Sequence, residues 1–194
     1  GIECTIPAQV AQEGAVVVKA GLFSNAVKKM PDFEETAQIE VNEKEMIHLS
    51  CGNANFDFST AKADEFPHMP AVLEESSFTI KENTLKSMIR QTIYAVAQSG
   101  IKPQLTGVYF DIKDGVFCMV GCDGYRIAIR KEPIETTSQF HFILPGKTAK
   151  ELLSIIGDSD DSIQILLSQK NAQINLKNCT MVTRLIEGEY LDYT

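Results

Sequence analysis

Five cysteines and three histidines are the side chains of this 194-residue chain that could supply a nucleophile, a base or a soft metal ligand. They are Cys4, Cys51, Cys118, Cys122, Cys179, His48, His68 and His141. Cys118 and Cys122 lie in one expected strand, on the same face but ~13 Å apart, too far for a disulfide or a shared metal ion. The odd count and the absence of a C-x-x-C pair favour neither a disulfide framework nor a zinc site, so we expect reduced, mostly buried thiols. A thiol-dependent enzyme remains an alternative only if folding brings a histidine base to one cysteine.

Two short motifs resemble ligand-binding loops but lack residues that the chemistry needs. DSDD at 158–161 would begin a calcium loop, yet Ile163 and Gln169 stand where such a loop has Gly and Glu. PGKT at 145–148 has the Lys-Thr pair of a phosphate loop without the preceding glycine. We therefore expect no metal, no cofactor and no enzymatic activity.

The stretch CDGYRIAIR, residues 122–130, combines a turn with exposed chemistry. Asp123-Gly124, like Asp114-Gly115, is a dipeptide that favours a type I′ hairpin turn because the backbone needs positive φ there. Tyr125 and Arg126 follow the second turn directly. This placement predicts a hairpin, and it leaves open whether the tip also presents a surface for binding.

The secondary structure that would position these residues indicates an α+β fold with an internal repeat. Apolar periodicity predicts helices over 20–30, 82–98 and 145–156. Alternating apolar runs separated by polar turns predict strands within 39–60, 105–132 and 162–185. The order of helix, acidic loop and strands occurs twice, with 56–67 aligning on 180–191. The chain thus holds the second half of one helix-and-sheet module and all of another.

The charge is acidic overall but basic on the helices. The 26 acidic and 18 basic residues give a net charge of -8, which argues against binding nucleic acid by bulk attraction. The expected helices nevertheless carry six cations and only Glu82 and Glu151 as acids. The six are Lys28, Lys29, Lys86, Arg90, Lys147 and Lys150. Such faces suit a phosphate backbone, although lysine is also simply a good helix former on a solvated face.

Targeting signals are not seen in the sequence. No apolar run approaches the ~20 residues of a membrane span, and no secretory leader is recognisable, so we expect a soluble, cytoplasmic protein. The chain begins GIECTIP without an initiator Met. We expect it to be a portion of a longer protein.

Several stretches, in order and spacing, resemble the bacterial DNA polymerase III β subunit, the sliding-clamp family. They are FPHMP, KENTLKSMIRQTIYAVA, LTGVYFDIKDG, CDGYRIAIR, FILPGKTAKELL and TRLIEGEYLDY. The resemblance assigns residues 1–66 to the latter part of clamp domain I and 67–194 to clamp domain II. It implies a ring of repeated helix-plus-antiparallel-sheet modules, with helices on the inner face and sheets outside. The implied function is a processivity factor that encircles double-stranded DNA as a homodimer when full length.

The resemblance also implies a groove that takes short linear peptides from the replicative polymerase, the clamp loader and repair proteins. Its wall in this chain would be Leu105, Cys122, Gly124, Tyr125, Arg126, Ile127 and Leu191. The apolar side chains and the tyrosine ring offer contact area, while Gly124 lets a backbone approach. The family usually has Pro in place of Leu191 and often Thr in place of Cys122. A generic peptide-binding module without a DNA role is the other reading.

For DNA, the resemblance implies contacts from the inner helices and from the loop QSGIKPQ. The residues concerned are Lys28, Lys86, Arg90, Gln98, Lys102, Gln104, Lys147 and Lys150. Contacts of this kind position a duplex without reading its sequence. The strand with Phe56 and Phe58 is expected at the edge that closes the ring against another subunit.

Overall fold

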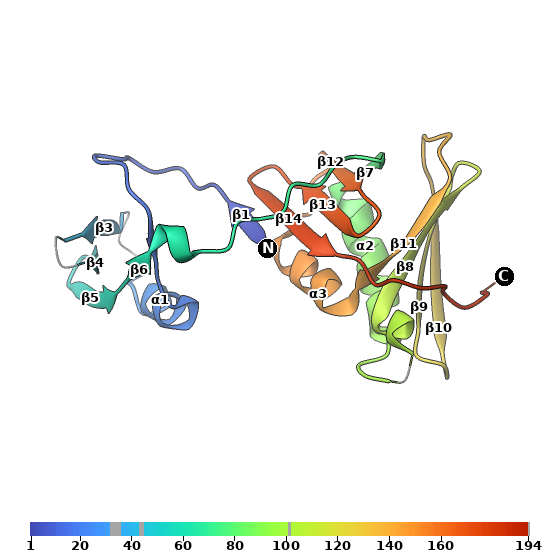
Figure 1. The fold of residues 1–194 in the computed structure, drawn as a ribbon, viewed down its shortest axis with the longest axis horizontal. Coiled ribbons are helices and arrows are strands. Elements are labelled where there is room, and N and C mark those ends of the chain that lie inside the picture. The colour runs from blue at the N-terminus through green and yellow to red at the C-terminus, as the bar shows by residue number, and fades with distance from the viewer. Residues whose placement is uncertain (32–35, 43–44, 101, 194) are drawn as a thin grey trace. The chain divides into compact units, whose positions relative to one another are not determined.

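The computed structural model describes residues 1–31, 36–42, 45–100 and 102–193, and it divides into two compact units (Figure 1). The larger unit is formed by residues 1–7 together with 69–194. The smaller unit is residues 8–68, which are therefore inserted between the first strand of the larger unit and the rest of it. Part of the expected acidic loop, residues 32–35, lies outside the described residues.

The larger unit contains two antiparallel sheets built from two copies of one pattern. The first copy is β7 (Ser76–Lys81), α2 (Glu82–Thr92), β8 (Gly107–Lys113), β9 (Val116–Cys122) and β10 (Ile127–Pro133). The second is β11 (Phe140–Pro145), α3 (Gly146–Ile155), β12 (Ser162–Leu167), β13 (Asn171–Asn175) and β14 (Cys179–Arg184). The sheets have the strand orders β10-β9-β8-β11 and β1-β14-β13-β12-β7, where β1 is Ile2–Cys4. The first strand of each copy thus pairs within the other copy's sheet, which joins the two copies into one body.

The core of the larger unit lies between these sheets and the two helices. Leu85, Met88 and Ile89 form the buried stripe of α2, and Leu152 is the equivalent contact from α3. Phe110 of β8 is buried against the rings of Phe117 and Phe142. The regular helical spacing explains why the sequence predicts helices at these two places.

Close packing of α2 on β9 requires a residue without a side chain. A Cβ added to Gly121 would collide with the backbone carbonyl of Thr92 at the end of α2. After α2 the chain tightens into a 3₁₀ turn, η2 (Ile93–Ala95), and a second such turn, η3 (Pro103–Thr106), precedes β8. The helix expected over 82–98 is therefore shorter than the apolar pattern indicates.

The smaller unit shows the repeated order again. It contains β2 (Val16–Val17), α1 (Ala20–Val27), β3 (Gln38–Val41), β4 (Met46–Cys51), β5 (Ala54–Ser59), β6 (Ala61–Lys62) and the 3₁₀ turn η1 (Ala63–Glu65). The sheet β3-β4-β5 follows α1 as β12-β13-β14 follows α3. Alternate residues Ile47, Leu49 and Cys51 of β4 are buried, as period-two patterning requires. The repeat expected from the sequence is confirmed in element order.

The expectation that all cysteines are reduced is wrong for two of them. Cys4 and Cys179 form a disulfide across a sequence separation of 175 residues. Spacing along the chain gives no sign of this pairing, because it arises where β1 aligns with β14. Cys51, Cys118 and Cys122 are free and buried, as expected.

The loop after α3 is fastened to the start of α2. Glu82 accepts hydrogen bonds from the Gly157 backbone N–H at 2.9 Å and from the Ser159 hydroxyl at 2.6 Å. Lys86 donates to Asp158 at 2.8 Å. The acidic DSDD stretch therefore serves as an anchor for α2.

This anchor predicts a pH-dependent stability. The Ser159 hydrogen bond, with those from Gly157 and the nearby Lys86, holds the pKa of Glu82 below its ordinary value of 4.5. Its stabilising effect is complete above the unfolded-state pKa and is lost as the pH falls through the lowered folded-state pKa. Glu82→Gln should flatten the decline in the free energy of unfolding between about pH 5 and pH 3. Urea denaturation at several pH values checks this, with Glu135→Gln at an exposed position as the matched control. An unchanged slope in Glu82→Gln would contradict it.

Candidate functional site

The loop between β9 and β10 is built around the carboxylate of Asp123. One oxygen, Oδ1, accepts the backbone N–H groups of Tyr125 and Arg126, both at 3.0 Å. The other, Oδ2, accepts Nε of Arg126 at 2.9 Å. The backbone N–H of Gly124 points to the Cys122 sulfur at 3.3 Å. One side chain thus fixes both the path of the loop and the direction of the Arg126 guanidinium.

The expectation of a type I′ turn at Asp123-Gly124 is wrong. Because Cys122 pairs with Ile127, four residues separate the two strands, and of the dipeptide Gly124 alone has positive φ, at 92°. At Asp114-Gly115 both residues have positive φ, 53° and 74°, as a type I′ turn requires. The difference arises because the Asp123 side chain closes the longer loop.

The loop carries a fixed negative charge beneath an exposed positive one. The hydrogen bonds from Tyr125 and Arg126, with the adjacent guanidinium, hold the pKa of Asp123 below its ordinary value. Asp123 is therefore ionised at neutral pH. Arg126 remains 60% exposed while it pairs with this carboxylate.

The outer surface of the loop is aromatic and apolar. Tyr125 is fully exposed, and Ile127 is 46% exposed beside it in sequence. The guanidinium carbon of Arg126 lies 5.8 Å from the ring centroid of Tyr94, which is itself 60% exposed. Such a distance allows a cation–π interaction. Tyr94, in η2, is a surface residue that the sequence patterns did not single out, although its place off the apolar stripe of the helix expected over 82–98 was an available signal.

The remaining expected groove residues lie in two other segments. Leu105 is half-buried in η3, and its backbone carbonyl accepts the N–H of Ala97 at 2.9 Å. Leu191 is half-buried in the segment that follows β14. Its neighbour Tyr190 lies near Cys122, and burial, with a smaller effect of Cys122, raises the pKa of the Tyr190 hydroxyl. The C-terminal segment therefore reaches the end of β9, where the Asp123 loop begins.

Aromatic stacking holds this C-terminal segment against the sheet. The rings of Tyr190 and Tyr109 are parallel, with centroids 4.7 Å apart. Burial, with the nearby Asp111, raises the pKa of Tyr109 to about 12. The Tyr193 hydroxyl donates to Asp111, and the Ile186 N–H donates to the Ile143 carbonyl at 3.0 Å. The segment is thus a fixed part of the surface.

The residues expected to face DNA fall into three groups: exposed cations on α2 and α3, one cation neutralised by an ion pair, and residues outside these two helices. Arg90 of α2 and Lys147 and Lys150 of α3 are exposed, and the two helices contact each other. Lys86 is 8% exposed and paired with Asp158, so it has little charge to offer a phosphate. The residues that lie elsewhere are Lys28 at the end of α1, and Gln98, Lys102 and Gln104 between α2 and β8. Of these four, Gln104 is half-buried beside Gly188 and the others are exposed.

The expected subunit edge lies in the smaller unit. Phe56 and Phe58 project from β5 as half-buried, stacked rings whose centroids are 6.4 Å apart. Phe58 also contacts Phe23 of α1. Within the described residues, β5 is an end strand of the sheet β3-β4-β5.

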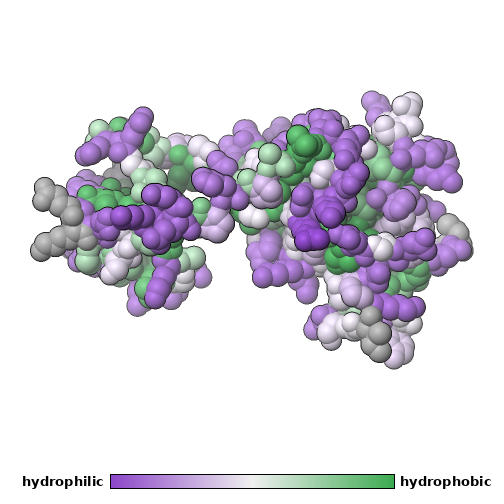
Figure 2. Space-filling model, in the orientation of Figure 1, coloured by the Kyte–Doolittle hydropathy of each residue, from purple (hydrophilic) through white to green (hydrophobic). Residues whose placement is uncertain are grey.

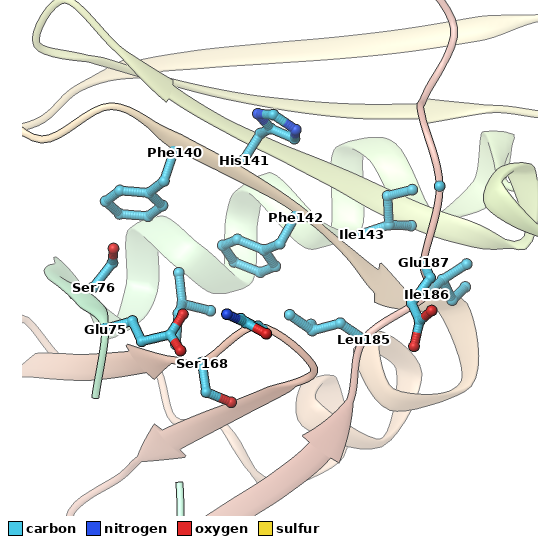
Figure 3. Close-up of a pocket in the computed structure, with 13 residues that line it drawn as sticks. Glu75, Ser76, Phe140, His141, Phe142, Ile143, Ser168, Leu185, Ile186 and Glu187 are labelled. Atoms are coloured by element: carbon cyan, nitrogen blue, oxygen red, sulfur yellow. The ribbon is translucent and has the colours of Figure 1, made fainter. Parts of the chain in front are cut away.

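A hollow of about 370 Å³ on the larger unit contains none of the expected site residues. Figure 3 shows Phe140 and Phe142 of β11 on one side and Leu185, Ile186 and Glu187 on the other.

In the part of the chain that the structure describes, no cluster of three His, Cys, Asp or Glu side chains could hold a metal ion. Within the same residues, no helix is long and apolar enough to cross a membrane. The face in Figure 2 is mostly hydrophilic with scattered apolar patches.

The family is decided by two matches that follow one another along the chain. The family model for the central domain of the DNA polymerase III beta subunit matches residues 79–192, and that for its N-terminal domain matches residues 1–70. The chain belongs to the DNA polymerase III beta subunit family. Both the resemblance and the α+β clamp fold expected from the sequence are confirmed.

Individual relatives agree with this family. The beta sliding clamp of Halalkalibacterium halodurans is 34% identical over 94% of this chain and 48% of its own length. The Bacillus subtilis beta sliding clamp is 32% identical over 95% of this chain and 49% of its own. The crystal structure of the sliding clamp from Bacillus subtilis has a TM-score of 0.87 and covers all of this chain and 53% of that one. A putative beta subunit from Eubacterium rectale has the same score at 32% identity, over 98% of this chain and 52% of its own. The chain spans about half the length of the relatives it matches.

Proposed function

We propose that this chain is a portion of a sliding clamp, a non-enzymatic processivity factor for the bacterial replicative DNA polymerase. The supporting observation is that domain models for the N-terminal and central parts of one family match in order along a chain with the clamp fold. The whole protein would encircle double-stranded DNA in the cytoplasm as a homodimer. Residues 1–66 would belong to its first domain and 67–194 to its second, with Phe56 and Phe58 near the subunit edge.

Exposed cations on the helices support the DNA part of this proposal. Arg90, Lys147 and Lys150 are exposed on two helices that contact each other, within a chain of net charge -8. Lys28, Gln98, Lys102 and Gln104 would add further contacts. Lysine and arginine reach phosphates without reading bases, so binding would be weak, salt-sensitive and independent of sequence. Lys86 would help to hold α2 in place rather than contact a phosphate, because Asp158 already neutralises its charge.

The loop around Asp123 supports the part of the proposal that concerns binding of partner proteins. Tyr125, Arg126 and Ile127 are exposed on a loop whose backbone is fixed by one carboxylate, and preorganised aromatic and arginine side chains make strong anchors for a peptide. Leu105, Cys122, Gly124 and Leu191 would complete this wall. Polymerase, clamp-loader and repair proteins would bind it through short linear peptides.

Retention on circular DNA tests the proposal. The full-length protein, loaded by its host's clamp loader onto nicked circular duplex, is expected to remain bound through gel filtration and to be released when the circle is linearised. Topological enclosure explains both results, since a ring slides off an open end. Equal loss from circular and linear DNA would leave the peptide-binding module without a DNA role as the better reading.

The helix charges predict a specific salt dependence for direct DNA binding. Lys147→Gln with Lys150→Gln should reduce the slope of log affinity against log salt by about 2, since each phosphate contact contributes about 0.9. Binding of the full-length protein to a short duplex, followed by fluorescence anisotropy between low and moderate salt, measures this slope. Lys170→Gln with Lys177→Gln removes the same charge from exposed turns of the sheet and serves as the control. Equal slopes for the two double variants would contradict the helix assignment.

A further inference from the structure

The Cys4–Cys179 disulfide lies at a position of the β1–β14 ladder that favours cross-linking. The amino group of Gly1 donates to the Val182 carbonyl at 2.7 Å, and the Val182 N–H donates to the Gly1 carbonyl at 2.9 Å. The Thr5 N–H donates to the Asn178 carbonyl at 2.8 Å. Counting along the register, the Cys4–Cys179 pair falls at a site without hydrogen bonds between the two residues. Directly opposite residues approach most closely at such sites, and here the Cα atoms are 4.1 Å apart. The pairing of the strands therefore brings the two sulfur atoms together.

The disulfide is open to solvent, unlike the other cysteines. Cys4 is exposed and Cys179 half-buried, because β1 is the last strand of its sheet. Cys51, Cys118 and Cys122 are buried. Exposed disulfides exchange with thiols far more readily than enclosed ones do. Of the five cysteines, a soluble thiol thus has access only to the two that form the disulfide, Cys4 and Cys179.

The strand that the disulfide holds is weakly attached otherwise. β1 has three residues, all exposed, and it contacts the sheet along one edge only. Only residues 5–7 separate it from residues 8–68, so that β1 lies beside one of the two points where the chain passes between the units. The other junction, at residues 68–69, leads into the body of the larger unit. Holding β1 in place therefore fixes one of the two attachments of the smaller unit.

We propose that Cys4 and Cys179 form a redox-controlled staple that locks β1 onto β14 when oxidised and releases it when reduced. In the closing reaction the Cys4 thiolate attacks a low-molecular-weight disulfide, forms a mixed disulfide and expels one thiol. The Cys179 thiolate then attacks the Cys4 sulfur and expels the second thiol, so that the protein loses two electrons and the small disulfide gains them. A dithiol reductant reverses both steps and ends as a cyclic disulfide.

Release has a structural consequence for the sheet. Without β1, the backbone N–H and C=O groups of β14 that now bond to it become an unpaired edge. The smaller unit then stays attached to the larger one through residues 68–69 and through a loose N-terminal segment. The staple thus couples the redox state to the integrity of one sheet edge and of one junction in the chain.

The test uses the protein in buffers that contain graded ratios of oxidised to reduced glutathione. Trapping the thiols by alkylation, followed by mass spectrometry, should show Cys4 and Cys179 converting together while Cys51, Cys118 and Cys122 stay thiols. Amide hydrogen exchange at Thr5 and Val182, whose N–H groups bond across the β1–β14 ladder, should accelerate on the order of tenfold or more on reduction. Cys4→Ser should show the fast exchange in every buffer, and Cys51→Ala should still switch.

Two results would overturn the proposal. The first is a pair that stays fully reduced at the highest proportion of oxidised glutathione, or fully oxidised in excess dithiothreitol. The second is equal exchange at Thr5 and Val182 in the oxidised and reduced protein, which would make the disulfide a passive cross-link. Both readouts are made on the unmodified protein, so neither depends on a variant folding.

Discussion

Phe110→Ala is expected to lower the free energy of unfolding of the larger unit by about 3–5 kcal/mol, the usual loss for a buried aromatic truncated to alanine. Phe110 is 1% exposed and stacks on Phe142 with centroids 4.5 Å apart. Phe117 covers it at 5.3 Å from the neighbouring strand β9. The surrounding strands are hydrogen-bonded on both sides of β8, so they cannot collapse far into the cavity.

Urea denaturation followed by circular dichroism measures this loss. Tyr125→Ala removes an aromatic ring of similar size from a fully exposed position in the same unit and should change the stability by less than about 0.5 kcal/mol. A loss below about 1 kcal/mol for Phe110→Ala would mean that the two sheets do not share the core described here.

The second large effect is expected at the Asp123 loop. In the full-length protein, Tyr125→Ala with Arg126→Ala should weaken binding of a partner peptide by at least about 30-fold, equivalent to about 2 kcal/mol. Tyr125 offers a fully exposed ring, and Arg126 is held in position by Asp123 and lies over Tyr94. The change removes both anchors and leaves the backbone hydrogen bonds of the loop to Asp123 in place.

Isothermal titration with a short linear peptide from the host polymerase measures the affinity. Arg184→Ala is the matched control, since Arg184 is also exposed and also pairs with an acidic residue three positions away, Glu187. Self-association of the double variant, measured by analytical ultracentrifugation, should equal that of the unchanged protein. An unaltered peptide affinity would exclude this loop from the binding groove.

Much of the fold could be predicted because its signals are local. The apolar stripe of α2 with Leu85 and Ile89, and the Asp114-Gly115 turn, each depend on residues a few positions apart. The strands that were not anticipated include β7, in which only Phe78 and Ile80 are buried, and β11, an apolar run that leads directly into α3. Each pairs with a strand of the other copy, so its partner is far away in sequence.

The same distinction between local signals and contacts of distant segments applies to the candidate site. The exposed tip with Tyr125 and Arg126 follows from the residues 122–130 themselves. The length of that loop does not, because the pairing of Cys122 with Ile127 sets it. Tyr94 beneath Arg126 comes from a different element, and sequence periodicity alone did not place it there.

The sequence by itself determined the order of the helices, the repeat and the cationic character of the helices, since periodicity, turn residues and composition act over short distances. Its motifs, taken in order, carried the resemblance to the family. Tertiary structure alone decided that Lys86 is neutralised by Asp158, 72 residues away, and that Cys4 meets Cys179 across 175 residues. The physical reason is that contacts between distant segments depend on strand register and on which faces become buried. Both are set by packing of the whole unit.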